Sequence, residues 1–180
     1  MRKFIVALIV VLGCLNVASA QAGKKASVQE KKDLFQLISK NDRMIVDGIK
    51  DGGLVANTLA KELSVKKIDL NNDGQPEYIA VIVDPYLCGA HGNCPNWIYR
   101  KAGGEYHLLL DANGETLAVE KNSTNKFRDL RSEGSNTAFE SSGTIFKFNG
   151  TVYEESECYA ITYDQRGKSG KKRVTKCGDH

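Results

Sequence analysis

One short stretch of the chain carries side chains suited to holding a metal ion. Oxygen-bearing residues stand at positions one, three, five and nine of this stretch, and a glycine at position six permits a sharp turn. A hard cation such as Ca²⁺ takes about six to eight oxygen ligands at about 2.3–2.6 Å. The pattern therefore predicts a calcium site, with ligands from the side chains of Asp69, Asn71, Asp73 and Glu77 and from the backbone carbonyl of Gln75.

This stretch resembles two known kinds of calcium loop. Its opening is similar to an EF-hand loop, but Ala80 stands at position twelve, where an EF-hand needs a bidentate Glu. The calcium loops of FG-GAP (integrin-type propeller) repeats fit better, with Glu77 where that family more often has Asp. The match occurs once, so it implies no repeat propeller. The alternative interpretation is an ordinary turn between strands, because Asn, Asp and Gly dominate turns.

A second segment, between Cys88 and Cys94, is rich in small residues and has His91 at its centre. Closed by a disulfide, it would be a constrained loop that loses little entropy on binding. It is similar to the short Cys-x-x-His-x-Cys loop of Ivy-type vertebrate lysozyme inhibitors, with one more residue before the second cysteine. That resemblance implies that His91 enters an enzyme cleft. The alternatives are a loop stapled for stability, or a zinc site made with reduced thiols, which an oxidising compartment disfavours.

Recognisable catalytic motifs are absent from the sequence: there is no Gly-x-Ser-x-Gly elbow, phosphate loop or His-Glu-x-x-His. The acid pairs Glu154/Glu155 and Asp129/Glu133 keep a hydrolase open, although exposed carboxylates are the commoner explanation. A structural place in a strand is expected for His107. Four aromatic residues on the predicted strands could form a binding platform, but we expect them in the core. They are Trp97, Tyr99, Tyr106 and Phe127.

Residues 1–20 have the features of a signal peptide. Two basic residues precede an apolar run, and Ala18-Ser19-Ala20 is a small-residue cleavage signature. The apolar run is shorter than the roughly 20 residues that a membrane span needs. We expect an exported chain that begins at Gln21, in the periplasm or secreted. The alternative is a lipid anchor on Cys14, because the residues before it loosely resemble a bacterial lipobox.

Four cysteines remain after this cleavage, and an even number in an exported chain predicts disulfides. Three pairings are possible. We favour Cys88–Cys94 and Cys158–Cys177, because each pair brackets a plausible loop or hairpin. Each bond would then staple a local segment of the fold.

Length and charge favour one domain without a nucleic-acid role. The chain has 180 residues, and two of its 25 basic residues lie in the signal peptide, against 22 acidic residues. The mature protein is therefore nearly neutral, which is no signal for nucleic acid. Basic residues do cluster between 166 and 176. That cluster suits an anionic surface or, as we favour, a solvated hairpin.

The residue pattern predicts a disordered segment at 21–26 and one α+β domain at 27–180. Ser27 and Glu30 form a capping-box pattern that starts the first of three short helices, and the third is expected over Leu54–Leu63. Strands follow, and Asn149-Gly150 predicts a two-residue hairpin. The expected fold is therefore short N-terminal helices and then a twisted, mainly antiparallel β-sheet, stapled by disulfides. The expected strands are Val65–Leu70, Tyr78–Val83, Trp97–Arg100, Tyr106–Leu110, Leu117–Val119, Phe127–Leu130, Thr144–Phe148, Thr151–Tyr153, Tyr159–Tyr163 and Arg173–Cys177.

This layout resembles uncharacterised exported bacterial proteins. They share the acidic strand-loop ending at Tyr78, then a Cys-rich loop, a strand with a Trp and a late Asn-Gly-x-x-Tyr hairpin. The resemblance spans most of Val65 to Tyr163 and implies no activity. We therefore expect a non-enzymatic binding or interaction domain with a structural calcium loop, whose partner is an envelope or extracellular protein. The alternatives are an enzyme inhibitor presenting His91 and a hydrolase without a recognisable motif, and the oligomeric state stays open.

Overall fold

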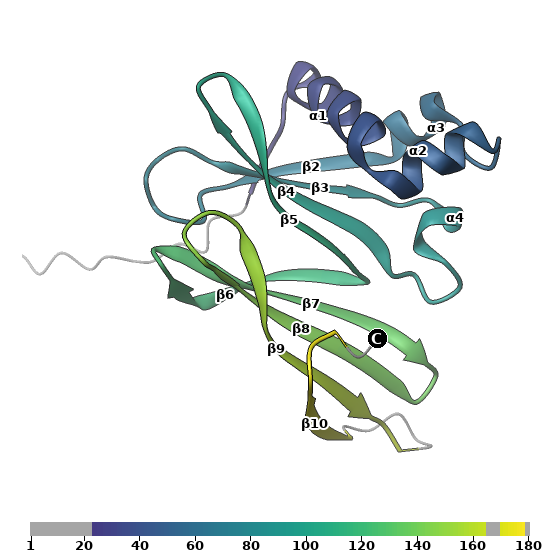
Figure 1. The fold of residues 1–180 in the computed structure, drawn as a ribbon, viewed down its shortest axis with the longest axis vertical. Coiled ribbons are helices and arrows are strands. Elements are labelled where there is room, and N and C mark those ends of the chain that lie inside the picture. Colours follow the sequence, from purple (N-terminus) through teal and green to yellow (C-terminus); the bar gives the residue numbers. More distant parts are fainter. Residues whose placement is uncertain (1–22, 165–169, 179–180) are drawn as a thin grey trace, which may run out of the picture.

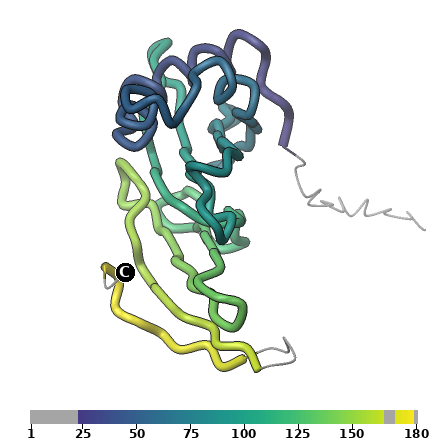
Figure 2. Tube along the Cα trace, turned by 90° about the vertical axis from the view of Figure 1, so that its right-hand side faces the viewer, coloured from purple at the N-terminus to yellow at the C-terminus, as the bar shows by residue number. Residues whose placement is uncertain are grey.

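The computed structural model describes residues 23–164 and 170–178. A layer of helices, a first antiparallel sheet and a second antiparallel sheet follow one another along the molecule (Figure 1). Figure 2 shows the helices at one end and the yellow C-terminal strand at the other. The predicted signal peptide, Cys14, Arg166 and Lys168 lie outside the described residues. Within the described ranges, no helix is both long and apolar enough to cross a membrane.

The helices begin where the sequence supplies a cap. The capping box is confirmed: the Ser27 hydroxyl accepts a hydrogen bond from the Glu30 N–H at 3.2 Å, and the Glu30 carboxylate accepts one from the Ser27 N–H at 2.6 Å. The second helix begins after Asp42, whose carboxylate accepts from the Ile45 N–H at 3.0 Å. The helices are α1 (Val28–Asn41), α2 (Arg43–Lys50), α3 (Ala56–Glu62) and α4 (Pro85–Cys88).

The first sheet has five antiparallel strands in the order β1-β2-β3-β4-β5. Its middle strand is buried on both faces, as predicted, because Tyr78 and Ala80 point into one core and Ile79 into another. At its edge, a bulge inserts Leu109 between the paired residues Leu108 and Leu110. The strands are β1 (Lys24–Lys25), β2 (Leu63–Ile68), β3 (Glu77–Ile82), β4 (Cys94–Ala102) and β5 (Glu105–Gly114).

The second sheet is a meander in the order β10-β9-β8-β7-β6. The predicted pairing of the last two strands is confirmed, with Tyr159 opposite Val174. The Cys158–Cys177 disulfide joins the same two segments. The strands are β6 (Thr116–Thr124), β7 (Phe127–Thr137), β8 (Glu140–Phe148), β9 (Tyr153–Thr162) and β10 (Lys171–Thr175).

Two apolar cores hold the layers together. The first lies between the helices and the first sheet, where Leu34 and Ile38 of α1 pack with Trp97 of β4. The second lies between the two sheets, where Ile98 of β4 packs with Leu130 of β7. Each fully buried aliphatic side chain contributes roughly 1.5–3 kcal/mol relative to an exposed one. The first sheet therefore has no free face, and its edges and loops remain available to a ligand.

The α+β class, the antiparallel pairing and both favoured disulfides are confirmed. The strands form two sheets, however, where the sequence predicted one. The prediction of a disordered segment at 21–26 is wrong for Lys24 and Lys25, which form β1 against Lys67 and Lys66. Pairing with an otherwise open edge of β2 orders these two residues.

Three further boundaries differ from the predictions. The third helix is shorter, because Val55 is its exposed N-cap and Leu63 already pairs with Ile82 in the sheet. Helix α4 was missed, although Asp84 before a proline is a recognisable start. The β8–β9 connection is longer than two residues, because the Asn149 side chain accepts hydrogen bonds from two following N–H groups and closes a wider turn.

Candidate metal site between the second and third strands

The predicted calcium loop connects β2 to β3, with Ile68 opposite Glu77 at its base. Two positions in it have positive φ, Asn72 at 59° and Gly74 at 85°. Asn and Gly tolerate this backbone region better than other residues do. The chain can therefore reverse sharply enough for the first and last residues of the loop to face each other.

Hydrogen bonds within the loop organise its side-chain oxygens. The two Asp69 carboxylate oxygens accept from the Asp73 N–H at 3.2 Å and the Gly74 N–H at 2.9 Å. The Asn71 side chain also accepts from Asp73 N–H, at 3.0 Å, and donates to the Asp73 carboxylate at 2.8 Å. The other Asp73 oxygen accepts from the Gln75 N–H at 2.7 Å. The loop thus gathers two carboxylates and an amide at one turn, as an Asx-rich turn or a metal loop would.

Glu77 is the unusual member of the set, because its side chain is fully buried. Its Oε2 accepts a hydrogen bond from the Leu70 N–H at 2.8 Å, while its Oε1 is buried without a hydrogen-bond partner. Burial, together with the nearby charges of Asp73 and Asp69, raises the pKa of Glu77 to about 7, although the hydrogen bond from the Leu70 N–H lowers it. A buried carboxylate oxygen without a partner is costly, so this position calls for a proton or a cation.

The loop is fastened to the second sheet at its first two residues. The Leu70 carbonyl accepts from the Arg128 N–H at 2.9 Å, and the Asp69 carbonyl accepts from Arg128 Nη2 at 3.0 Å. The Tyr153 hydroxyl of β9 donates to the Arg128 carbonyl at 2.8 Å. Sequence reasoning gave no sign of Arg128, because it lies far along the chain from the loop. The loop therefore sits where the two sheets meet.

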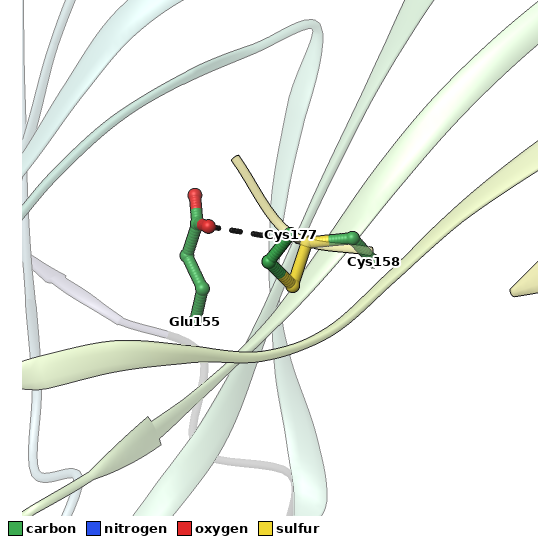
Figure 3. A group of neighbouring side chains, drawn as sticks. All are labelled: Glu155, Cys158 and Cys177. Atoms are coloured by element: carbon green, nitrogen blue, oxygen red, sulfur yellow. Dashed lines mark hydrogen bonds between the residues drawn. A yellow bond between two sulfur atoms is a disulfide. The ribbon is translucent and has the colours of Figure 1, made fainter. Parts of the chain in front are cut away.

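The donor set fits a hard cation, since every candidate ligand is an oxygen. The carboxylates of Asp69, Asp73 and Glu77 are not drawn together: among the described residues, only Glu155, Cys158 and Cys177 offer three such ligand atoms within 4.8 Å of one another. That group holds no thiolate, because Cys158 and Cys177 form a disulfide (Figure 3). An ion in the predicted loop would have to pull its ligands inward.

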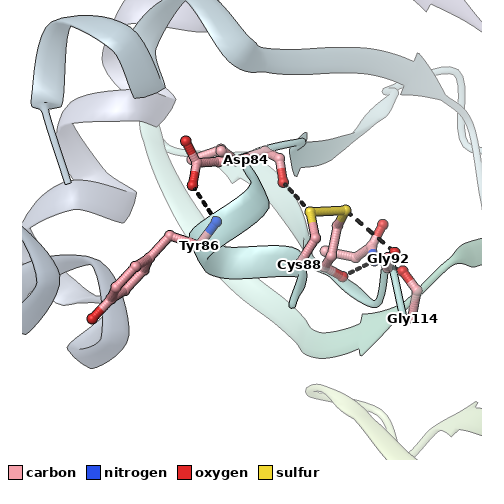
Figure 4. Close-up of a disulfide and its surroundings, with 8 residues drawn as sticks. Asp84, Tyr86, Cys88, Gly92 and Gly114 are labelled. Carbon is pink, nitrogen blue, oxygen red and sulfur yellow. Dashed lines mark hydrogen bonds between the residues drawn. A yellow bond between two sulfur atoms is a disulfide. The ribbon is translucent and has the colours of Figure 1, made fainter. Parts of the chain in front are cut away.

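The second predicted segment is a disulfide loop at the end of α4 (Figure 4). Cys88 and Cys94 are bonded with Cα atoms 3.9 Å apart, so the zinc alternative fails because no free thiol remains. His91 is exposed on the loop. Next to it, the Asn93 side chain accepts from the Ser135 N–H at 3.1 Å and donates to the Ser135 carbonyl at 3.0 Å. The second sheet therefore braces the base of the loop.

The acids that the sequence offered as pairs have different surroundings in the structure. Glu133 accepts a hydrogen bond from the Tyr159 hydroxyl at 2.6 Å and pairs with Arg131. Burial opposes its ionisation, but these partners lower the pKa of Glu133. Asp129 is buried, with its Oδ1 unpartnered. Glu154 is exposed and accepts a hydrogen bond from the Asn149 side chain.

The structure also places the four aromatic residues and the strand histidine that the sequence singled out. Trp97, Tyr99 and Phe127 are buried in the two cores, as favoured, and Tyr106 packs partly buried against the first core. They form no exposed platform. His107 does lie in a strand, but its side chain is exposed, so it has no part in the core.

A different acidic pair was missed by the sequence. The Asp42 carboxylate accepts from the Trp97 indole N–H at 3.2 Å. Asp111 lies near enough that burial and the charge of Asp42 raise its pKa, against a hydrogen bond from Trp97. Both acids line a cavity of about 430 Å³ with Asp47. No local motif announces this pair, because the two acids come from a helix cap and a distant strand.

Comparison with known proteins adds no relative: no family model, curated protein or solved structure matches the chain. The interpretation of its function therefore depends on the geometry of the loop at Asp69–Glu77 and of the disulfide loop.

Proposed function

We propose that this protein is an exported binding module, without enzymatic activity, that a structural Ca²⁺ ion stabilises. The ion is held by side-chain oxygens of Asp69, Asn71, Asp73 and Glu77 and by the Gln75 carbonyl. The observation that carries this proposal is Glu77 Oε1, which is buried without a hydrogen-bond partner in a side chain whose pKa the charges of Asp73 and Asp69 raise. A divalent cation would satisfy this oxygen and offset the repulsion between the three carboxylates.

The arrangement favours an ion over a simple turn for a physical reason. A turn needs the side chains of Asp73 and Asn71 to accept backbone N–H groups, and one Glu77 oxygen to accept the Leu70 N–H. It does not need the second Glu77 oxygen, which is buried without a partner. Burying an unpaired carboxylate costs several kcal/mol unless something compensates it. Oxygen ligands without sulfur or imidazole suit Ca²⁺ or Mg²⁺, and the flexible ligand geometry that Ca²⁺ accepts suits a loop that must close inward.

The ion would act on the join between the sheets. Leu70 is fully buried in the core between them, and its N–H binds Glu77 while its carbonyl binds the Arg128 N–H. Fixing Glu77 would therefore fix Leu70 and the start of β7. In this proposal the metal stabilises the scaffold, and the binding surface lies elsewhere on the molecule.

The test is a thermal melt of the oxidised protein in calcium and in chelator. We expect calcium to raise the unfolding free energy by about 2.7 kcal/mol at a hundredfold excess over its dissociation constant, since a ligand of the native state stabilises by mass action. Asp73→Ala should lose this rise. Asp51→Asn removes an exposed charge at the end of α2 and should keep it.

The two variants also separate a metal ligand from a turn residue. Equal losses for Asp73→Ala in calcium and in chelator would mean that Asp73 only shapes the turn. The same melts in magnesium would show whether the loop prefers the larger cation. No stabilisation of the wild type by either cation would end the proposal.

Export is the natural setting for this module. Two disulfides are compatible with an oxidising compartment, where free extracellular calcium is also available to a weak site. We propose a periplasmic or secreted protein cleaved before Gln21, with a lipid anchor on Cys14 as the alternative. Its partner would be an envelope or extracellular protein.

A second candidate function uses the disulfide loop as an enzyme inhibitor. The observation that favours it is the exposed His91 on a loop closed by Cys88–Cys94 and braced through Asn93. Such a preorganised loop binds with little entropic cost. Inhibition of a lysozyme by the wild type, lost in His91→Ala and kept in His107→Ala, would support it. No inhibition by the wild type would exclude this class of target.

A further inference from the structure

The outer edge of β5 offers unpaired backbone groups. This strand is the last of its sheet and pairs only with β4. Among the described residues, no hydrogen bond reaches the outer backbone edge of residues 105–111. Unpaired N–H and C=O groups in an extended strand are a template for another strand.

A groove runs along this edge. Two cavities, of about 540 Å³ and about 520 Å³, share Leu108, Leu109 and Val152 in their linings, so they are adjacent along the strand. Leu108 is 45% exposed, which makes it one of the large apolar side chains that the surface leaves open. Unpaired backbone groups of β5 therefore lie beside apolar side chains, as they do at sites where a peptide adds a strand to a sheet.

The far side of the groove is walled. Glu154 and Glu155 at the start of β9 line one cavity, and Leu37 and Thr151 line the other. Val152, in the turn before β9, lines both. Figure 2 shows the yellow-green turn between β8 and β9 pointing up towards the blue helical layer. These residues bound the groove on the side opposite the β5 edge, so a broad flat surface cannot lie against both sides at once. The groove thus suits a single extended peptide better than a second copy of this chain.

The two ends of the groove differ in charge. At one end lie His107 and Arg100, which are opposite one another in the β4–β5 pairing. No ion pair joins Arg100 to a carboxylate in the described part of the chain, and its buried Nε has no hydrogen-bond partner. The lining of the other end includes three acidic residues, Asp111, Glu154 and Glu155. The groove therefore runs from basic to acidic in the direction of β5.

We propose that this groove binds an extended peptide segment of a partner protein as an added antiparallel strand. An antiparallel ligand places its N-terminal end beside Asp111 and its C-terminal end beside Arg100. The matching ligand has basic residues first, alternating β-branched residues in the middle and acidic residues last. Its backbone pairs with β5, and its apolar side chains rest on Leu108 and Val152. This proposal does not depend on calcium binding.

The probes are two synthetic, end-capped peptides of identical composition. One reads Lys-Lys-Thr-Val-Thr-Val-Thr-Glu-Glu, and the other has its charged ends exchanged. Each is titrated into the full oxidised protein while backbone amide shifts are followed by NMR. We expect the first peptide to bind at least about tenfold more tightly than the second, a difference of about 1.4 kcal/mol, and to shift the amides of residues 105–111.

Variants locate the contact. Leu108→Lys should weaken binding of the first peptide by about tenfold or more, because a charge at an edge blocks strand addition. Val174→Lys is the matched control, since Val174 is 65% exposed on the edge strand β10. Arg100→Glu should weaken the first peptide and strengthen one with lysines at both ends.

Three results would overturn the proposal. One is the absence of saturable shifts with either peptide, and another is equal affinity for both charge orders. The third is a set of shifts centred on β6 or β10 and unaffected by Leu108→Lys. A variant that fails to fold is recognised by its NMR spectrum, and Leu108→Lys replaces an exposed side chain, so at least one informative variant should remain.

Discussion

Two carboxylates near the start of β3, those of Glu30 in α1 and Glu77 in β3, have opposite environments. Glu30, at the start of α1, accepts hydrogen bonds from the Ser27 N–H at 2.6 Å, the Tyr78 hydroxyl at 2.8 Å and the Lys67 ammonium at 3.2 Å. Glu77, the residue before Tyr78, accepts one N–H and leaves an oxygen unpartnered. The protein supplies hydrogen-bond donors to both oxygens of Glu30 but to only one oxygen of Glu77.

The difference shows in the acidity of the two groups. Burial opposes ionisation of Glu30, but the hydrogen bonds from Ser27, Tyr78 and Lys67 outweigh it and lower its pKa to about 2. Burial dominates at Glu77 and raises its pKa to about 7. The same chain can clearly satisfy a carboxylate with its own donors. That it does not do so at Glu77, within an aspartate-rich loop, is what points to an external cation there.

The largest expected effect is a pH dependence of stability in chelator. The folded pKa of Glu77 lies above its ordinary value of 4.5, so its contribution is fully present below that pH and is lost as pH rises through about 7. We expect the unfolding free energy to fall by about 2–3 kcal/mol between about pH 5 and about pH 8. Urea unfolding at both pH values measures it, and Glu77→Gln should flatten the slope.

Calcium should change this pH dependence, because a bound cation would favour the ionised form of Glu77 over the protonated form. A bound divalent ion favours the ionised carboxylate, so calcium should remove most of the loss at high pH in the wild type and have no effect in Glu77→Gln. A wild-type slope that is identical with calcium and with chelator would break the proposed link between this carboxylate and a metal.

The second effect concerns the completed carboxylate. Glu30→Gln keeps the size of the side chain but removes the charge that three donors stabilise, and it should cost about 1–2 kcal/mol near neutral pH. The folded pKa of Glu30 is lowered, so its contribution is present above the ordinary value of 4.5 and is lost as pH falls towards about 2. Urea unfolding should show the same loss in calcium and in chelator.

Glu62→Gln is the matched control for this variant, since Glu62 is an exposed acid at the end of α3. It should change the unfolding free energy by less than about 0.5 kcal/mol. A Glu30→Gln loss that depends on calcium would remove the contrast between the two carboxylates.

Sequence patterns predicted those features that depend on neighbours along the chain. The capping box at Ser27 and Glu30, the buried strand after the acidic loop and the short disulfide loop were all predictable, because each is closed by residues a few positions apart. The candidate ligands at Asp69 and Asp73 were visible for the same reason. Local spacing contains their geometry.

Features that depend on long-range packing were not visible. Nothing near Glu77 indicates that its side chain is fully buried, because that follows from the second sheet covering the loop. The division into two sheets also escaped prediction, since alternating strands specify an antiparallel partner but not where a sheet ends. Arg128 shows the same limit: its contact with Asp69 exists only once β7 crosses the base of the loop.

The smallest expected effect concerns the anchor that holds the loop independently of the proposed ion. Arg128→Met removes the hydrogen bond from Nη2 to the Asp69 carbonyl but keeps the backbone bond to Leu70. We expect a loss of about 1 kcal/mol by urea unfolding, equal in calcium and in chelator, because this contact anchors the backbone of the loop and ligates nothing. Arg43→Met, which removes an exposed pair with Asp47, should cost almost nothing. If Arg128→Met instead abolished calcium stabilisation while Arg43→Met did not, Arg128 would be part of the proposed metal site. The contrast between Glu30, which protein donors stabilise, and Glu77, which the proposed ion stabilises, would then include a residue of the second sheet.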